Sequence, residues 1–259
     1  VRPLAALTSL GLPGDLEEGG LRELIRGLRD ASREYGFSLI GGDTNECPDL
    51  VIACSLFGLS REGELVLRSG ARPGDILATT GGFGLTYLGL KALLEGLELG
   101  GGVRKEALRA VLMPKARLEV GVALARSGVL TSSIDSSDGL AWSLHELSRA
   151  SGVGFLVEDL PLAQGVLEEA TRLGLDPFEV CFYGGEEYEL VMTVEPARWE
   201  EAVEVAQEAG VELRKIGRAV EEPGVWFKGP DGHLRPVEAR GWEHFRARGR
   251  HHGRSSLPP

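Results

Sequence analysis

Hydrophobic and polar positions along the chain follow two alternating periods, one helical and one strand-like. Leu21, Leu24 and Leu28 recur at helical spacing and Gly36 follows them, which is typical of an amphipathic helix that ends at a glycine. Short apolar runs bounded by glycine, proline and aspartate predict strands. The predicted strands cover 37–43, 50–59, 76–80, 154–158 and 213–219, the second of them buried, and a hairpin is expected around 229–232.

Helical patterns separate these runs. The predicted helices cover about 85–97, 105–125, 140–152, 166–173 and 199–209. Pro114 is expected to break or kink the second of them, because proline lacks the amide N–H. Strands that alternate with helices predict an α/β or α+β fold. The 259 residues allow one large or two medium domains, and a Gly/Pro turn near residues 68–75 predicts domains of 1–68 and 69–259.

Composition and charge narrow the range of partners. The chain is 42% hydrophobic and 26% charged, without an apolar run near the roughly 20 residues of a membrane helix. Without a signal-peptide pattern either, we expect a cytoplasmic protein with no membrane partner. A net charge of −11 and no dense basic cluster before the last residues argue against a nucleic-acid partner. An acidic protein can still bind phosphates if a divalent cation lies between the like charges.

The stretch SSIDSSDGL (132–140) places two aspartates three positions apart, just before a helical pattern. One interpretation is that Ser137 or Asp138 caps the following helix. A single cap does not account for Asp135 at the end of an apolar strand as well. The other interpretation is that Asp135 and Asp138 share a hard cation such as Mg²⁺. The pattern alone leaves both open.

Two further stretches combine glycine pairs with acidic residues. LIGGDT (39–44) has two interpretations. In the first it is a turn at its glycines, in which the Asp43 side chain hydrogen-bonds to its own backbone. In the second Asp43 is a carboxylate at the end of a strand, and the glycines allow a phosphate to approach the backbone. YGGEEYEL (183–190) places glycines before acidic residues in an apolar strand region. Three such stretches in one chain favour a phosphate or metal site.

Two common nucleotide motifs are excluded. The P-loop pattern fails because Leu90 precedes Lys91, and the Rossmann glycine pattern that would start at Gly82 has Tyr87 at its last position. The glycines at 81–84 favour a tight turn, although N–H groups at a helix start can also bind an anion.

The motifs LIGGDT, LRSGARPGD, MPKARLEVGVALA, IDSSDGL, GGEEYEL and GWEHF occur in this order, and together they resemble the thiamine-monophosphate kinase family along essentially the whole chain. That family belongs to the ATP-binding superfamily typified by aminoimidazole ribonucleotide synthetase. The resemblance implies a homodimer with an N-terminal α/β domain that dimerises through its sheet and a C-terminal α/β domain stacked against it. It also implies Mg²⁺-assisted transfer of the γ-phosphoryl group of ATP to thiamine monophosphate, giving thiamine diphosphate.

The resemblance also implies roles for individual residues. Asp43, Asp135 and Asp138 match Mg²⁺ ligands, Gly42, Ser137 and Arg68 match nucleotide contacts, and Glu186 and Trp242 match positions that hold the thiamine moiety. The expected catalytic set is Asp43, Asp135, Asp138 and Arg68. An acid beside the cationic thiazolium and an aromatic ring for stacking suit that ligand.

The start of the chain departs from the family pattern. Family members carry a preceding segment with further metal-binding aspartates, whereas this sequence begins at Val1 without a methionine. We therefore expect the N-terminal domain to be incomplete here. The alternatives to the kinase are another member of the superfamily with a different acceptor and a non-catalytic nucleotide-binding module.

Overall fold

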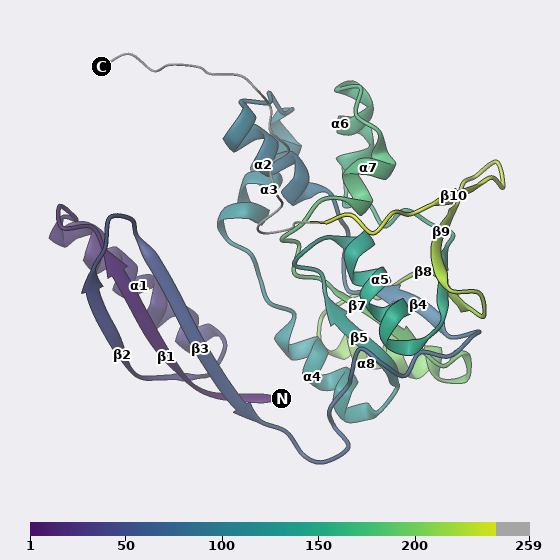
Figure 1. Ribbon diagram of the computed structural model, residues 1–259, viewed down its shortest axis with the longest axis horizontal. Coiled ribbons are helices and arrows are strands. Elements are labelled where there is room, and N and C mark those ends of the chain that lie inside the picture. The colour runs from purple at the N-terminus through teal and green to yellow at the C-terminus, as the bar shows by residue number, and fades with distance from the viewer. Residues whose placement is uncertain (242–259) are drawn as a thin grey trace, which may run out of the picture.

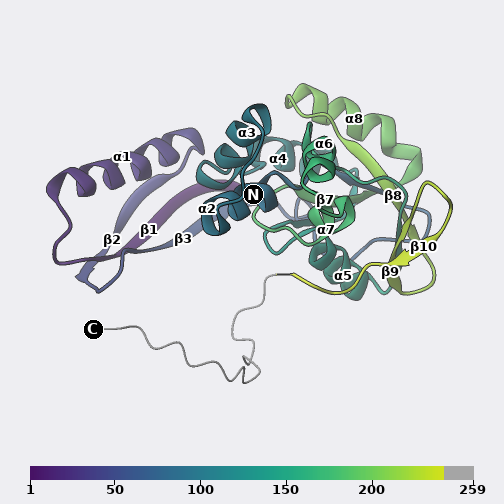
Figure 2. The same ribbon diagram turned by 90° about the horizontal axis from the view of Figure 1, so that it is seen from above.

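The computed structural model describes residues 1–241, which form two parts with separate sheets (Figures 1 and 2). The strands are β1 (Arg2–Leu12), β2 (Ser38–Glu46), β3 (Val51–Leu59), β4 (Ile76–Thr79), β5 (Leu130–Asp135), β6 (Gly154–Val157), β7 (Leu190–Val194), β8 (Arg214–Val220), β9 (Gly224–Lys228) and β10 (Leu234–Pro236). The helices are α1 (Glu18–Glu34), α2 (Leu85–Glu95), α3 (Gly101–Leu112), α4 (Leu118–Ser127), α5 (Leu140–Ser151), α6 (Val166–Arg172), α7 (Pro177–Phe182) and α8 (Trp199–Glu208), with a short 3-10 helix η1 (Pro196–Arg198). Within these residues no helix has the length and apolar character needed to cross a bilayer.

The N-terminal part is a three-stranded sheet with one helix. The strand order is β2-β1-β3, with β1 parallel to β2 and antiparallel to β3. Helix α1 connects the two parallel strands and runs along one side of the sheet (Figure 2). The predicted stripe of Leu21, Leu24 and Leu28 is its half-buried side, and Gly36 with φ of 69° follows its C-cap. The prediction of this helix is confirmed.

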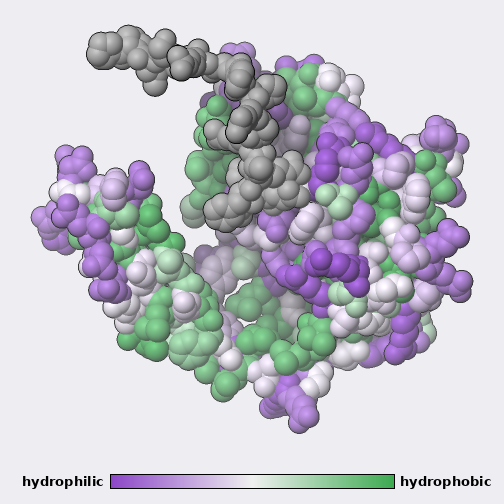
Figure 3. Space-filling model, viewed as in Figure 1, coloured by the Kyte–Doolittle hydropathy of each residue, from purple (hydrophilic) through white to green (hydrophobic). Residues whose placement is uncertain are grey.

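The prediction of a strand at residues 50–59 is confirmed by β3, but the prediction that this strand is buried is wrong. Ile52, Leu56 and Phe57 are 45%, 57% and 50% exposed. The apolar side chains of this part form a green surface in Figure 3. β3 is an edge strand of a small sheet, and within residues 1–241 the one helix beside the sheet leaves these side chains uncovered. An apolar run predicts a strand that can be buried, but it does not supply the layer that buries it.

The C-terminal part is a seven-stranded sheet between helices. Its order is β10-β9-β6-β8-β4-β7-β5, and all neighbouring pairs are antiparallel except β6 with β9. Successive residues of a strand face opposite sides. Leu77 and Val191 therefore pack with α5 and α7, whereas Ala78 and Met192 pack with α4 and α8. The predicted α/β class is confirmed.

Several element boundaries follow from local chemistry. The predicted break at Pro114 is confirmed, since α3 ends at Leu112 and α4 begins at Leu118. Helix α7 was not predicted, although Asp176 accepts a hydrogen bond from Phe178 N at 2.9 Å and Pro177 occupies its first turn, which is a recognisable helix start.

Candidate functional site

Two loops meet at the end of β5 and form the centre of the candidate site. We name them the aspartate loop (135–139), which begins at the last residue of β5, and the glutamate loop (183–189), which connects α7 to β7. Three backbone hydrogen bonds join them, from Glu186 N to Ser137 O (2.8 Å), from Tyr188 N to Ser136 O (3.2 Å) and from Ser136 N to Glu189 O (2.8 Å). The motifs IDSSDGL and GGEEYEL, distant in sequence, thus share one place in the fold.

The close contact of the two loops requires a glycine at position 139. Gly139 has φ of 102°, and a Cβ atom there would lie 2.1 Å from Gly184 O. Gly139 itself is the N-cap of α5, and among the described residues no side chain caps this helix. The interpretation of Ser137 or Asp138 as the cap is therefore wrong. The N-cap position is occupied by Gly139, in a conformation that favours glycine, and the side chains of Ser137 and Asp138 do not cap the helix.

Four of the predicted residues surround one small hollow at the end of β5. Arg68, Asp135, Ser137 and Asp138 line it together with Glu146 of α5. The structure thus brings a cation and two predicted metal ligands to one place. A guanidinium suits phosphate oxygens, and carboxylates suit a divalent cation.

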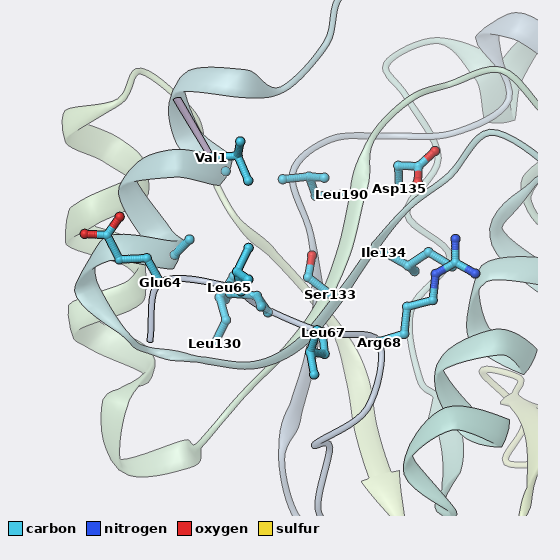
Figure 4. Close-up of a pocket in the computed structure, with 13 residues that line it drawn as sticks. Val1, Glu64, Leu65, Leu67, Arg68, Leu130, Ser133, Ile134, Asp135 and Leu190 are labelled. Carbon is cyan, nitrogen blue, oxygen red and sulfur yellow. The ribbon is translucent and has the colours of Figure 1, made fainter. Parts of the chain in front are cut away.

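Arg68 reaches this hollow because its segment follows the edge of β5. Ser133 N donates to Leu67 O at 3.0 Å. Figure 4 shows Arg68 and Asp135 on the same side of the adjoining pocket. The guanidinium Nη1 lies 3.5 Å from Glu146 Oε2, yet the side chain remains 56% exposed. The arginine is consequently accessible to an anionic ligand.

A larger cavity of about 690 Å³ shares Ser137 and Asp138 with the hollow. Glu186 and Tyr188 of the glutamate loop and Tyr87 of α2 contribute to its wall. A carboxylate and aromatic rings around one space favour a cationic, ring-shaped ligand. Because two residues line both spaces, an anionic group and a cationic ring of one ligand can be held side by side.

Negative charge accumulates where the two spaces meet. Burial raises the pKa of the Tyr188 hydroxyl, and the carboxylates of Glu186, Asp135 and Asp138 raise it further. A phenol is harder to ionise when other anions are close. This region therefore attracts cations.

The aspartate loop offers oxygen ligands suited to Mg²⁺. Asp135 and Asp138 flank Ser136, whose buried Oγ has no hydrogen-bond partner within the described residues. Mg²⁺ binds carboxylate oxygens and keeps several of its waters. Across residues 1–241, however, no three His, Cys, Asp or Glu side chains gather closely enough to hold a metal, so Asp43 does not join this pair.

Gly42 and Asp43 lie in the other sheet, inside β2. Both interpretations of LIGGDT placed them at a turn or a strand end, and both are wrong on this point. The strand continues to Glu46 because β1 pairs with it throughout, and a Cβ atom at Gly42 would lie 1.8 Å from Thr8 O. Asp43 Oδ1 accepts a hydrogen bond from Thr44 N at 2.9 Å, but this bond lies within the strand and not in a turn.

Trp242 lies outside the described residues, and its predicted role stays a prediction. The residue before it, Gly241, lines the larger cavity, and a Cβ atom there would lie 2.4 Å from Asp138 O. Tyr87 and Tyr188 also line this cavity and were not predicted from the sequence. Their positions gave a weak signal, because each follows a glycine-rich stretch already suspected of binding a ligand.

Comparison with known proteins gives a consistent result. The profile for the AIR synthase related protein C-terminal domain matches residues 72–228, and that for the N-terminal domain matches residues 1–60. A thiamine-monophosphate kinase of Pyrococcus abyssi is 34% identical over 246 residues, which cover 94% of this chain and 73% of the relative.

Solved structures agree with these matches. The structure described as AaThiL complexed with AMPPCP and TMP has a TM-score of 0.80 and 29% identity, covering 94% of this chain and 74% of the other. The thiamine monophosphate kinase of Aquifex aeolicus has a TM-score of 0.76 and 29% identity, covering 90% and 75%. The chain thus spans about three quarters of these proteins.

Proposed function

The chain belongs to the AIR synthase related proteins and, among them, to the thiamine-monophosphate kinase family, and from this we propose that it phosphorylates thiamine monophosphate with ATP. The products are thiamine diphosphate and ADP. The observation that carries the proposal is the arrangement of Arg68, Asp135 and Asp138 beside a cavity that contains Glu186. Such a site combines phosphate binding with recognition of a cationic ring.

The reaction needs charge neutralisation more than covalent help from the protein. A phosphate that attacks a triphosphate is repelled by it, and its attacking oxygen is already largely ionised near neutral pH. Mg²⁺, when bound, would neutralise part of the phosphate charge. Asp135 and Asp138 would hold it, Arg68 would bind phosphate oxygens, and Ser137 would contact the nucleotide.

The acceptor occupies the larger cavity. Glu186 faces the positive charge of the thiazolium, and the rings of Tyr87 and Tyr188 provide aromatic surface. We assign Trp242 to the same ligand on the basis of the family motif. The shared residues Ser137 and Asp138 keep the phosphate of the acceptor next to the nucleotide.

The N-terminal part completes the proposed nucleotide site. Gly42 and Asp43 are assigned to the nucleotide and to a metal ligand, respectively, by the family motif. The division into domains of 1–68 and 69–259 falls between the two matched profiles and places the two sets of carboxylates on different domains. The nucleotide would then be bound by both domains.

An acceptor comparison tests the proposed function. The full-length protein is incubated with ATP and Mg²⁺, and ADP release is followed with thiamine monophosphate, thiamine, AMP or no acceptor. We expect ADP release above background with thiamine monophosphate alone. Equal release with another monophosphate would indicate a different acceptor, and nucleotide binding without release would indicate a binding module.

Glu186→Gln should weaken binding of the acceptor. Removing the charge that faces the thiazolium is expected to raise KM for thiamine monophosphate by about tenfold, which corresponds to roughly 1.4 kcal/mol, with a smaller change in kcat. Glu95→Gln is the matched control, since Glu95 lines the same cavity but is paired with Lys91 at 2.9 Å. Steady-state kinetics with varied acceptor measures both. An unchanged KM in Glu186→Gln would remove this residue from the acceptor site.

We further propose a homodimer formed through the N-terminal sheet. In the strand register Leu39 and Leu56 both pair with Ala6 and therefore share a face with it. Ala6 in the central strand is fully buried, so the open apolar surface is that of the two leucines in the flanking strands. Leu39 and Leu56 are 40% and 57% exposed. An apolar sheet face of this kind is typical of an interaction surface.

Leu56→Asp should therefore convert the dimer to a monomer. A charge placed within an apolar interface is expected to weaken association by at least about a hundredfold. Light scattering coupled to size exclusion measures the molar mass, with exposed Leu234→Asp on β10 as the control. A dimer that persists in Leu56→Asp would show that this face is not the interface.

A further inference from the structure

The side chains of the glutamate loop point to two sides, and only the side chains on one of these sides have a role in the proposed reaction. Glu186 and Tyr188 line the larger cavity, whereas Glu187 and Glu189 line a separate pocket. Glu186 has φ of 65° and Tyr188 has φ of 54°. Residues with a side chain rarely adopt this left-handed backbone, which persists only where the surroundings fix it. The loop must therefore be held from its other side.

Glu189 provides the first of two attachments. Its carboxylate accepts hydrogen bonds from Arg117 Nε at 2.7 Å and from Arg117 Nη2 at 2.5 Å. Thr80 Oγ1 donates to the same carboxylate at 2.7 Å. The Glu189 side chain is only 8% exposed. This bidentate, largely buried ion pair fixes the end of the glutamate loop, where β7 begins.

Glu187 provides the second attachment. Its Oε1 accepts a hydrogen bond from Gly84 N at 2.8 Å, at the start of α2, the helix that carries Tyr87. Its Oε2 is buried without a partner within the described residues. Burial raises the pKa of Glu187 to about 7, so the neutral form is well populated at neutral pH. The helix start that sequence analysis considered for an external anion is thus occupied by a side chain of the protein.

We propose that Glu187 and Glu189 are positioning residues for the acceptor site, which hold Glu186 and Tyr188 against the aspartate loop by tying the glutamate loop to α2 and to Arg117. The two residues line neither the hollow nor the larger cavity. Their effect on acceptor binding rests on the proposed function, whereas their effect on the loop itself does not. The two parts can be measured separately.

Glu169 offers a matched control. It is also a buried glutamate, and its Oε1 accepts a hydrogen bond from Gly100 N at 2.6 Å, at the start of α3. It is likewise paired with an arginine, Arg172, at 2.7 Å. It lies on α6 and lines neither the hollow nor the larger cavity. A merely structural role for Glu187 predicts equal effects of Glu187→Ala and Glu169→Ala on the site.

The test combines hydrogen exchange with kinetics on the full-length protein. Glu187→Ala is expected to speed amide exchange in 183–190 by at least about tenfold and to raise KM for thiamine monophosphate about tenfold, with kcat changed less. Glu187→Gln keeps the accepting oxygen and should restore both values to within about threefold. Glu169→Ala should change neither. Thr80→Val removes one donor to Glu189 and also the acceptor of Leu190 N, so its exchange is read at 183–189 alone. It should speed exchange there, and it replaces Glu187→Ala if that variant does not fold.

The outcomes separate this proposal from the proposed function. Faster exchange in 183–189 with Glu187→Ala and Thr80→Val supports the attachment even if thiamine monophosphate proves not to be the acceptor. Unchanged exchange in both variants overturns it whatever the reaction is. Equal changes in Glu187→Ala and Glu169→Ala overturn it too, because a general loss of stability would then account for them. With phosphorylation established, faster exchange without any change in KM overturns the positioning role.

Discussion

Asp138→Asn is expected to lower kcat for phosphoryl transfer by about 10²–10³-fold or more, the range seen when one group that stabilises transition-state charge is removed. Asp138 lines both the hollow with Arg68 and the cavity with Glu186, so under the proposed function its charge would act where the two phosphates meet. Asparagine has the same shape, and no side chain within the described residues caps α5. The free energy of unfolding should therefore change by less than about 0.5 kcal/mol.

Turnover at saturating Mg²⁺ and substrates, together with urea unfolding, measures these two quantities. Asp159→Asn is the control, because Asp159 is an exposed aspartate that follows β6 and lines neither space. The control should keep its activity and its stability. Full activity in Asp138→Asn would remove this residue from the metal site and leave Asp135 without its partner.

Gly139→Ala is expected to affect stability and activity together. The left-handed φ of 102° disfavours any side chain, and the new Cβ atom would lie 2.1 Å from Gly184 O. The two loops must then separate, which breaks their backbone hydrogen bonds. We expect the free energy of unfolding to fall by about 2–4 kcal/mol and kcat/KM for thiamine monophosphate to fall by at least about tenfold.

Gly152→Ala is the control that separates the effect of backbone strain from the effect of the steric clash between the two loops. Gly152 also has a left-handed φ, 70°, at the C-cap of α5, but within residues 1–241 no heavy atom beyond its two chain neighbours lies within 4 Å of its added Cβ. It should lose only about 1 kcal/mol of stability and no activity. Denaturant unfolding and steady-state kinetics compare the variants. Similar behaviour of the two alanine variants would show that the aspartate and glutamate loops tolerate separation.

The local elements of this fold are largely predictable from the sequence. Helix α1 follows from its leucine spacing and Gly36, and the break between α3 and α4 follows from Pro114. Strand β1 was not predicted, because the leucines of its sequence RPLAALTSLGL do not alternate with polar residues and the Ala, Ser and Gly residues between them have weak strand propensity. It forms through pairing with β2 and β3. Pairing of distant segments is a tertiary effect that local patterns do not contain.

The candidate site was predictable as a set of residues but not as a geometry. Asp135 and Asp138 could be suspected because a strand-end aspartate is costly without a partner. That the glutamate loop completes their site depends on Gly139 and on positive φ at Glu186, neither of which a sequence pattern signals. The family motif suggested Glu186, whereas the attachment through Glu187 is a contact with Gly84, a residue distant in sequence, and no local pattern signals it.

Asp43 shows the limit of reasoning from motifs. Its motif resembles the other two glycine-rich acidic stretches, yet it lies within β2 of a different sheet. Similar sequence chemistry therefore does not imply proximity, because the pairing of strands decides where each carboxylate lies.

A phosphorus NMR time course with ATP, Mg²⁺ and thiamine monophosphate, run on the full-length protein, tests the central claim most directly. The account predicts that the signals of thiamine diphosphate and ADP grow together at equal rates and stop growing when EDTA is added. A folded protein that yields no thiamine diphosphate under these conditions would contradict it.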